Sequence, residues 1–189
     1  QFFISRCGYT GEDGYEVSLK DRYTEKFISK LLQFEDVKLA GLGARNSLRM
    51  EAGLCLYGND ISIFTSPAEA GLTWSIPQER IENGGFIGHE NLTKDLRNGV
   101  ERKLVGIKPL GKLPAREGTQ ILSKKEEIVG EITSGGYSPS LQAPIAMGYV
   151  NSEILQKNYD ILLNVRDNLI PAEIVSLPFV EHKYFRGKK

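Results

Sequence analysis

The stretch EIVGEITSG, residues 127–135, is a short run of residues with high β-propensity. Similar runs lie on both sides of it, separated by turn residues at close spacing, at residues 103–110, 119–123, 145–151, 159–167 and 169–177. This spacing is typical of all-β barrels and sandwiches. Hairpin tips are expected at Lys124 to Glu127 and at Asp167-Asn168. The second is expected because Asp and Asn tolerate the left-handed turn conformation. We therefore expect a small antiparallel β-barrel domain at residues 100–189.

Residues 1–19 read as two extended pieces around the turn TGEDG. In the second piece the apolar residues recur with a period of two, which sends them to one face of a strand: Tyr15, Val17 and Leu19. Glu16 is therefore expected on the opposite face.

Two helices are expected next. Residues 21–34 have apolar positions three and four apart, with Asp21 as the N-cap. Residues 39–52 end at Gly53 and carry a stripe of small residues that permits close packing, formed by Gly41, Ala44, Leu48 and Ala52.

The rest of the first part is punctuated by glycine and proline. A short strand is expected at LTWSIP, residues 72–77, and a helix or loop at residues 89–97. Because strands and helices mix before residue 100 and only strand patterns follow, we place a domain boundary there. The predicted fold is α+β, with residues 1–99 as one domain portion.

The composition excludes several classes of partner. Lys and Arg number 24 against 24 Asp and Glu, so no overall field favours nucleic acid or an anionic membrane. Cys7 and Cys55 offer neither a disulfide framework nor, with only two histidines, a zinc set, which favours a reducing compartment. No apolar run reaches the roughly 18 residues of a membrane span. The N-terminus lacks the order of a signal peptide and reads as mid-strand sequence, which suggests a fragment.

Common catalytic motifs are also missing. There is no P-loop, no complete dinucleotide fingerprint and no nucleophile elbow GxSxG. His89 and His182 are far apart and are expected at the surface, so a triad site is disfavoured. Cys55 has no basic neighbour in sequence to activate it and is expected to be a small buried residue.

Two features have both a functional and a plain structural interpretation. Glu16 is either a solvated strand residue or, in a cleft, a carboxylate that accepts two hydrogen bonds from a flat N–H/NH2 edge. Its neighbours Glu12 and Asp13 are expected to serve the turn. Arg45 and Arg49 lie one helical turn apart without an acidic residue three or four positions away, so a carboxylate from another element or an anionic ligand should compensate them.

With these residues in hand, the sequence resembles the aminomethyltransferase (T-protein) family of the glycine cleavage system. The similarity rests on CGYTGEDGYEVSL, GLGARNSLRMEAGLCLYGND, LPAREG, EIVGEITSGGYSPSL, IAMGYV and LPFVEHKYF, in family order. It implies that the chain is the C-terminal half of a T-protein. Residues 1–99 would then be a ferredoxin-like middle-domain portion, truncated at its start, before the barrel at residues 100–189.

The resemblance also implies an activity. The family releases ammonia from the aminomethyl group on the dihydrolipoyl arm of H-protein and transfers the methylene unit to tetrahydrofolate, giving 5,10-methylenetetrahydrofolate. It implies tetrahydrofolate as co-substrate, H-protein and the other glycine cleavage components as partners, and no metal. A mitochondrial matrix protein is expected, or a cytoplasmic one if bacterial.

Four residues match the family's folate site. By position, Glu16 would bind the pterin edge, Arg45 would lie near the folate and the catalytic acid, and Tyr184 would close the cavity. Tyr9 would form a pocket wall or simply pack in the turn. The tail EHKYFRGKK would by itself be a frayed end.

Two departures from the family pattern stand out. Asn46 replaces the usual Asp, which would leave Arg45 less neutralised. The family's catalytic aspartate belongs to the N-terminal half, so this chain alone should be inactive.

The alternatives to an aminomethyltransferase are the folate-binding domain of a sarcosine or dimethylglycine dehydrogenase, or a non-catalytic folate-binding module. Against the related folate-binding protein of iron-sulfur cluster assembly stands GLCLYGND, where that protein has a KGCYxGQE-like segment.

Overall fold

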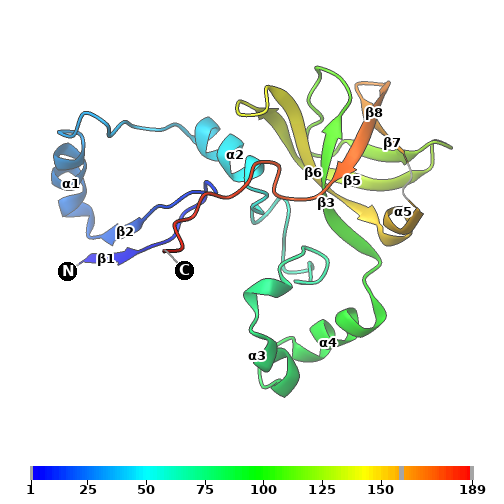
Figure 1. Cartoon of the computed structure of the whole chain (residues 1–189), viewed down its shortest axis with the longest axis horizontal. Helices are drawn as coiled ribbons and strands as arrows, with labels where there is room; N and C mark the ends of the chain where they lie inside the picture. The colour runs from blue at the N-terminus through cyan, green and yellow to red at the C-terminus, as the bar shows by residue number, and fades with distance from the viewer. Residues whose placement is uncertain (1, 158–159, 188–189) are drawn as a thin grey trace.

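The chain has three parts arranged around the end of one helix. The computed structural model describes residues 2–157 and 160–187. A two-stranded hairpin with a helix lies at one end, two short helices form a second part, and a closed barrel forms the third (Figure 1). The expected α+β class with a C-terminal antiparallel barrel is confirmed.

The N-terminal hairpin pairs β1 (Phe2–Ser5) with β2 (Glu16–Leu19) in antiparallel register. Val17 and Leu19 are half-buried, whereas Glu16 lies exposed on the other face, as the period of two predicts. The prediction for Tyr15 is wrong: its side chain is 69% exposed, because the strand begins one residue after it.

A 3-10 turn (Asp21–Tyr23) and α1 (Thr24–Leu31) follow the hairpin. Asp21 is not the N-cap that the sequence indicates. The cap position of the 3-10 turn falls on Lys20, and the Asp21 carboxylate instead accepts a hydrogen bond from the adjacent Arg22 N–H at 2.7 Å.

Helix α2 (Leu42–Glu51) confirms the second predicted helix, and Gly53 follows it with a φ of +66°. Its packing differs from expectation. Nothing in the described chain lies within 4 Å of where a side chain at Gly41 or Gly43 would be. The buried part of α2 is its last turn, Arg49 to Glu51.

The prediction of a strand at residues 72–77 is wrong. The segment forms a 3-10 turn (Thr73–Ser75) because both the N–H and the hydroxyl of Ser75 donate to the Leu72 carbonyl, at 3.0 and 2.7 Å. Two helices follow, α3 (Gln78–Asn83) and α4 (His89–Asn98), and the second confirms the helix expected at residues 89–97.

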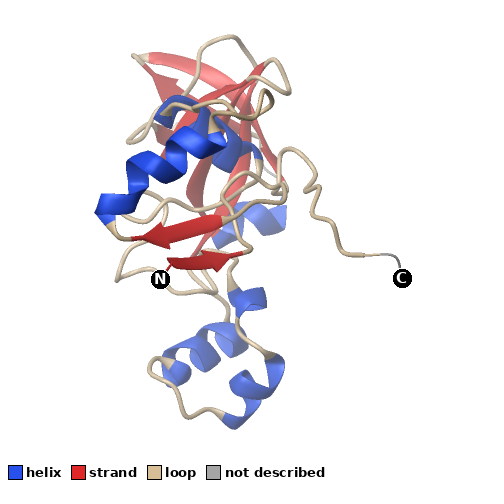
Figure 2. Ribbon diagram, turned by 90° about the vertical axis from the view of Figure 1, so that its left-hand side faces the viewer, coloured by secondary structure: helices blue, strands red, loops and turns tan. Residues whose placement is uncertain are grey.

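The barrel closes through six antiparallel strands in the order β3-β6-β5-β4-β7-β8, with α5 (Ser152–Lys157) after β6. Figure 2 shows the barrel strands in red at the top of the molecule, above the short N-terminal hairpin. The strands are β3 (Arg102–Pro109), β4 (Gln120–Ser123), β5 (Ile128–Ser138), β6 (Ala143–Asn151), β7 (Ile161–Val165) and β8 (Asn168–Val175). Apolar side chains fill the interior, among them Ile107, Ile121, Ile132, Val150 and Leu163. The hairpin at residues 124–127 is confirmed. The last hairpin turns at Arg166 and Asp167, one residue earlier than predicted, and both have positive φ.

Helix α2 also packs on this barrel. Met50 is 1% exposed and belongs to a second apolar cluster with four barrel residues, Leu104, Ile145, Met147 and Tyr149. We propose a domain boundary near residue 100. The last turn of α2 precedes this boundary in sequence but shares an apolar core with the barrel.

Candidate functional site

A buried ion pair stands at the junction of α2 and the barrel. Arg49 Nη1 lies 2.6 Å from Asp60 Oδ2, and the two side chains are 3% and 0% exposed. Arg49 also donates to Ser134 Oγ on β5 and to Asn46 Oδ1, both at 2.9 Å. Asp60 Oδ1 accepts from the Thr133 hydroxyl at 2.6 Å. The compensating carboxylate expected for one of the two arginines is therefore Asp60.

The same pair holds the loop of residues 53–60. Asp60 Oδ2 accepts the Leu56 N–H at 2.8 Å, and Arg49 Nη1 donates to the Leu54 carbonyl at 3.3 Å. Between these two anchors, the Cys55 carbonyl accepts the hydroxyl of Tyr9. Burial raises the pKa of Tyr9, so the hydroxyl keeps its proton at neutral pH.

Arg45 stacks on the ring of Tyr9. Its guanidinium carbon lies 4.7 Å from the ring centroid, which is a cation–π contact. Asn46 bonds to Arg49 and not to Arg45. Asn46 therefore contacts Arg49, whose charge Asp60 balances, while Arg45 contacts Tyr9.

Glu16 stands apart from these residues. It lies opposite Ser5 in the hairpin, on the face that carries Phe3 and Ser18, and it is exposed. Within the described residues, no hydrogen bond or ion pair joins it to Arg45 or Tyr184.

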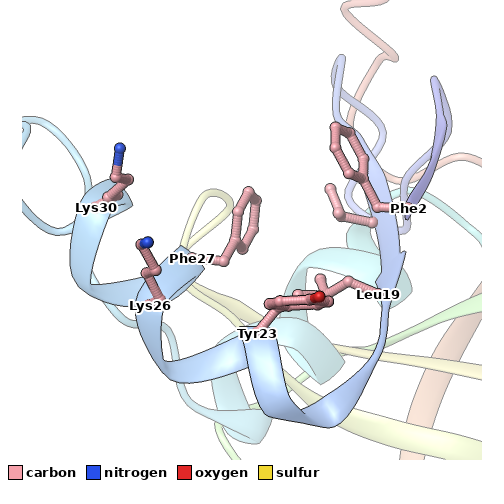
Figure 3. Close-up of a pocket in the computed structure, with 7 residues that line it drawn as sticks. Phe2, Leu19, Tyr23, Lys26, Phe27 and Lys30 are labelled. Carbon is pink, nitrogen blue, oxygen red and sulfur yellow. The ribbon is translucent and has the colours of Figure 1, made fainter.

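The opposite face of the hairpin is apolar. Figure 3 shows Phe2 and Leu19 of the hairpin facing Tyr23 and Phe27 across a cavity of about 320 Å³, with Lys26 among the other residues that line it. No candidate site residue lines this cavity. The hairpin therefore separates an apolar face toward α1 from a face that presents the Glu16 carboxylate.

The C-terminal segment returns from the barrel toward the first turn of the chain (Figure 1). Val180 N–H donates to the Glu51 carbonyl at 2.9 Å, and His182 Nε2 lies 2.8 Å from the Ala52 carbonyl. Tyr184 is half-buried, with its ring centroid 5.2 Å from that of His182. The tail, expected to be frayed on its own sequence, is instead docked, and His182 is bound at the end of α2 and is not a plain surface residue.

The acidic turn takes part in this docking. Asp13 Oδ2 accepts the Phe185 N–H at 2.8 Å, and Asp13 Oδ1 accepts from Arg6 at 2.9 Å. These two bonds lower the pKa of Asp13. Glu12 lies 3.5 Å from the Lys183 ammonium. The prediction that Glu12 and Asp13 serve only the turn is therefore incomplete.

A second cavity lies where these elements meet. It has a volume of about 650 Å³ between the end of α2, residues 70–74 and strands β3 and β8, with Lys103 and His182 at its wall. Cys55 also lines it, and burial raises the pKa of that thiol to about 11. This agrees with the expectation that Cys55 is not a nucleophile.

Other polar residues have structural partners. His89 is half-buried with Nε2 2.8 Å from the Ile81 carbonyl, so it too differs from the expected surface residue. Over residues 2–157 and 160–187, no group of three or more His, Cys, Asp and Glu side chains is placed to hold a metal ion. The described helices include none long and apolar enough to cross a bilayer.

Comparison with known proteins assigns two ranges of the chain to domain families. Residues 1–80 match the model of the GCVT N-terminal domain, and residues 102–181 match that of the glycine cleavage T-protein C-terminal barrel domain. The chain belongs to the T-protein family. The resemblance read from the sequence is thereby confirmed.

Named relatives agree with this assignment. A probable mitochondrial aminomethyltransferase of Schizosaccharomyces pombe is 45% identical over 183 residues, which are 97% of this chain and 47% of that protein. The mitochondrial aminomethyltransferase of Mesembryanthemum crystallinum is 42% identical over 98% of this chain and 46% of its own length. The crystal structure of glycine cleavage system aminomethyltransferase T from Bartonella henselae superposes with a TM-score of 0.93 at 41% identity, covering 98% of this chain and 51% of that one.

The T-protein chain described here spans about half the length of the curated relatives that it matches. The relatives from S. pombe and M. crystallinum are named mitochondrial, in agreement with the expected mitochondrial location. The sequence singled out Arg45, Arg49 and Tyr9 but not Asp60. The tail was expected to be frayed from the residues themselves, and only the resemblance placed Tyr184 back at the folate cavity. The acid directly after Gly58-Asn59 was the available signal for Asp60, because a carboxylate after a tight turn commonly bonds back to its own loop.

Proposed function

We propose that this chain is part of an aminomethyltransferase that releases ammonia from the aminomethyl group on H-protein and gives the methylene unit to tetrahydrofolate. The observation that carries the proposal is the match of both parts of the chain, in order, to the two T-protein domain models. H-protein, tetrahydrofolate and the other glycine cleavage components are the proposed partners, and the mitochondrial matrix is the proposed site of action.

The geometry supports a division of labour among the proposed site residues. The Glu16 carboxylate is exposed, and its two oxygens would accept the N–H and NH2 of a pterin edge, much as a carboxylate accepts a guanidinium. The Arg45 guanidinium would set the local field for a proton donor. Tyr184, carried by the docked tail, would close the folate cavity, and Tyr9 would flank it.

The chemistry requires a group beyond these. Attack by the folate N5 on the methylene carbon expels the amine, which needs a proton to leave as ammonia. The roles proposed for Glu16, Arg45, Tyr184 and Tyr9 do not include that donor. We propose that a carboxylic acid in the part of the relatives' length not matched by this chain supplies it, so that residues 1–189 alone are inactive.

The test compares two proteins by calorimetry and by ammonia release. Residues 1–189 alone should release no ammonia from aminomethylated H-protein. A protein that carries the additional half of a T-protein should bind tetrahydrofolate and release ammonia, and Glu16→Ala in it should weaken binding strongly. Folate binding without ammonia release in the longer protein would favour the non-catalytic folate-binding module. An unchanged affinity of the Glu16→Ala variant would remove Glu16 from the site.

A further inference from the structure

Arg45 lies against the aromatic ring of Tyr9. The contact with Tyr9 covers one face of the guanidinium plane, at 4.7 Å from ring centroid to guanidinium carbon. Within the described residues, no ion pair or side-chain hydrogen bond involves Arg45, and its side chain is exposed. A guanidinium stacked in this way keeps the N–H donors at its edge available for a ligand.

The ring of Tyr9 is itself fixed at both ends. Its backbone belongs to the turn between β1 and β2, and its hydroxyl donates to the Cys55 carbonyl. That carbonyl sits in the loop that the buried Arg49–Asp60 pair anchors at Leu54 and Leu56. The ring cannot turn away without breaking this bond. The support beneath Arg45 therefore extends from the barrel, through Asp60 and the loop, to Tyr9.

We infer that Tyr9 is a positioning residue that acts through Arg45, holding the guanidinium in the orientation that a folate cavity uses. This inference rests on the proposed function. It differs from a pocket-wall role, in which Tyr9 would touch the pterin directly. Preorganisation of the long arginine side chain lowers the conformational entropy lost when a ligand binds.

The first arm of the test is independent of function. In NMR spectra of the labelled chain, the ring current of Tyr9 should displace the Arg45 δ-proton resonances upfield. Tyr9→Leu should abolish this displacement, and Tyr9→Phe, which keeps the ring but loses the anchor to Cys55, should reduce it. The matched control is Tyr23→Leu, which removes the similar stack of Arg22 on Tyr23 at 4.8 Å and should leave the Arg45 signals unchanged. Undisplaced Arg45 signals in the unaltered chain overturn the inference even if Tyr9→Leu does not fold.

The second arm is a double-mutant cycle in the longer, active protein, read as tetrahydrofolate affinity and kcat/KM. With Arg45 present, Tyr9→Leu should weaken binding about two- to fivefold, the change that corresponds to an exposed cation–π contact, and Tyr9→Phe should recover part of it. In an Arg45→Ala background, Tyr9→Leu should have little further effect. An equal loss in both backgrounds would mean that Tyr9 touches the ligand directly, and it overturns the inference. If no version binds tetrahydrofolate, the proposed function fails and the NMR arm alone decides the role of Tyr9.

Discussion

The pair formed by Arg49 and Asp60 joins three segments that are distant in sequence. Both side chains are buried, and each has further hydrogen bonds that satisfy it. Replacing one partner leaves the other as an uncompensated charge in a region of low dielectric constant. Such a loss costs far more than the loss of an exposed pair.

We therefore expect Asp60→Asn to lower the free energy of unfolding by about 3–5 kcal/mol, measured by urea titration followed by circular dichroism. The matched control is Lys124→Gln, which breaks the exposed ion pair with Asp160 and should cost less than about 1 kcal/mol. Similar losses in the two variants would contradict the structural role given to Asp60.

Glu51 carries the prediction about pH. Burial opposes its ionisation, but the hydroxyls of Ser138 and Ser140 and the Ser140 N–H outweigh burial and lower the pKa below its ordinary value of 4.5. A carboxylate with a depressed folded-state pKa stabilises the fold above its unfolded pKa and loses this effect as the pH falls through the folded pKa.

The difference in unfolding free energy between the wild type and Glu51→Gln should therefore be largest near neutral pH. There it should be about 1–3 kcal/mol, as for hydrogen bonds to a charged group. It should shrink as the pH falls below about 4.5. Denaturant titrations at a series of pH values measure this difference, and a constant difference across the series would rule out Glu51 as the titrating group.

The sequence predicted that a group outside α2 compensates Arg49, but it did not identify that group as Asp60. No acid lies three or four positions from either arginine along α2, which left a carboxylate from another element or an anionic ligand as the partner. Asp60 lies eleven positions away, beyond a loop whose path depends on its contacts with the barrel. The cation–π partner of Arg45 was hidden for the same reason, since Tyr9 is 36 positions earlier in the chain.

At the scale of elements, the C-terminal segment is docked and is not a frayed end. We call residues 180–185, which make the docking contacts, the strap. Its backbone bonds to Glu51, Gly11 and Asp13, so it spans the end of α2 and the first turn. Asp13 holds the far end of the strap through Phe185.

Loss of the hydrogen bond between Asp13 and the Phe185 N–H should expose the strap to protease. We expect Asp13→Ala to raise the rate of tryptic cleavage after Lys183 and Arg186 several-fold, followed by mass spectrometry, while the barrel remains intact. The control is Glu35→Ala, an exposed carboxylate for which no hydrogen bond or ion pair is described. Equal cleavage rates would show that Asp13 does not hold the strap.

Local patterns predicted α2 and the barrel strands correctly but failed at residues 72–77. The period in α2 and the β-propensity of residues 127–135 predicted the correct element types. Residues 72–77 are apolar enough for a strand, but hydrogen bonds of Ser75 to Leu72 and the following Pro77 favour a tight turn. Docking of the tail depends on contacts about 130 to 170 positions away, which no local pattern carries.

At the scale of the whole molecule, α2 and the barrel share one apolar cluster across the proposed boundary near residue 100. The strand count was foreseeable from six short runs, but the order in which the barrel closes was not. That order depends on pairings such as β4 with β7, which connect residues about 40 positions apart.

The shared cluster predicts coupled unfolding. Met50→Ala should lower the stability of the barrel by about 2–4 kcal/mol, because it opens a cavity among barrel side chains. Leu48→Ala, two residues earlier and 39% exposed, should cost less than about 1 kcal/mol. Hydrogen exchange of β6 amides reports barrel opening in both variants. Unchanged protection in Met50→Ala would show that the barrel is independent of α2.

The closure of the barrel also affects how the protein behaves at high concentration. Each barrel strand has a pairing partner on both sides, so it offers no open backbone edge to another chain. The hairpin of β1 and β2 is different: among the residues that the structure describes, each of its strands pairs only with the other, and Phe2, Phe3 and Ile4 are all more than half exposed. For residues 1–189 taken by themselves, self-association by added strands should therefore involve the β1-β2 hairpin and leave the barrel untouched, and charged substitutions at exposed hairpin positions should reduce it.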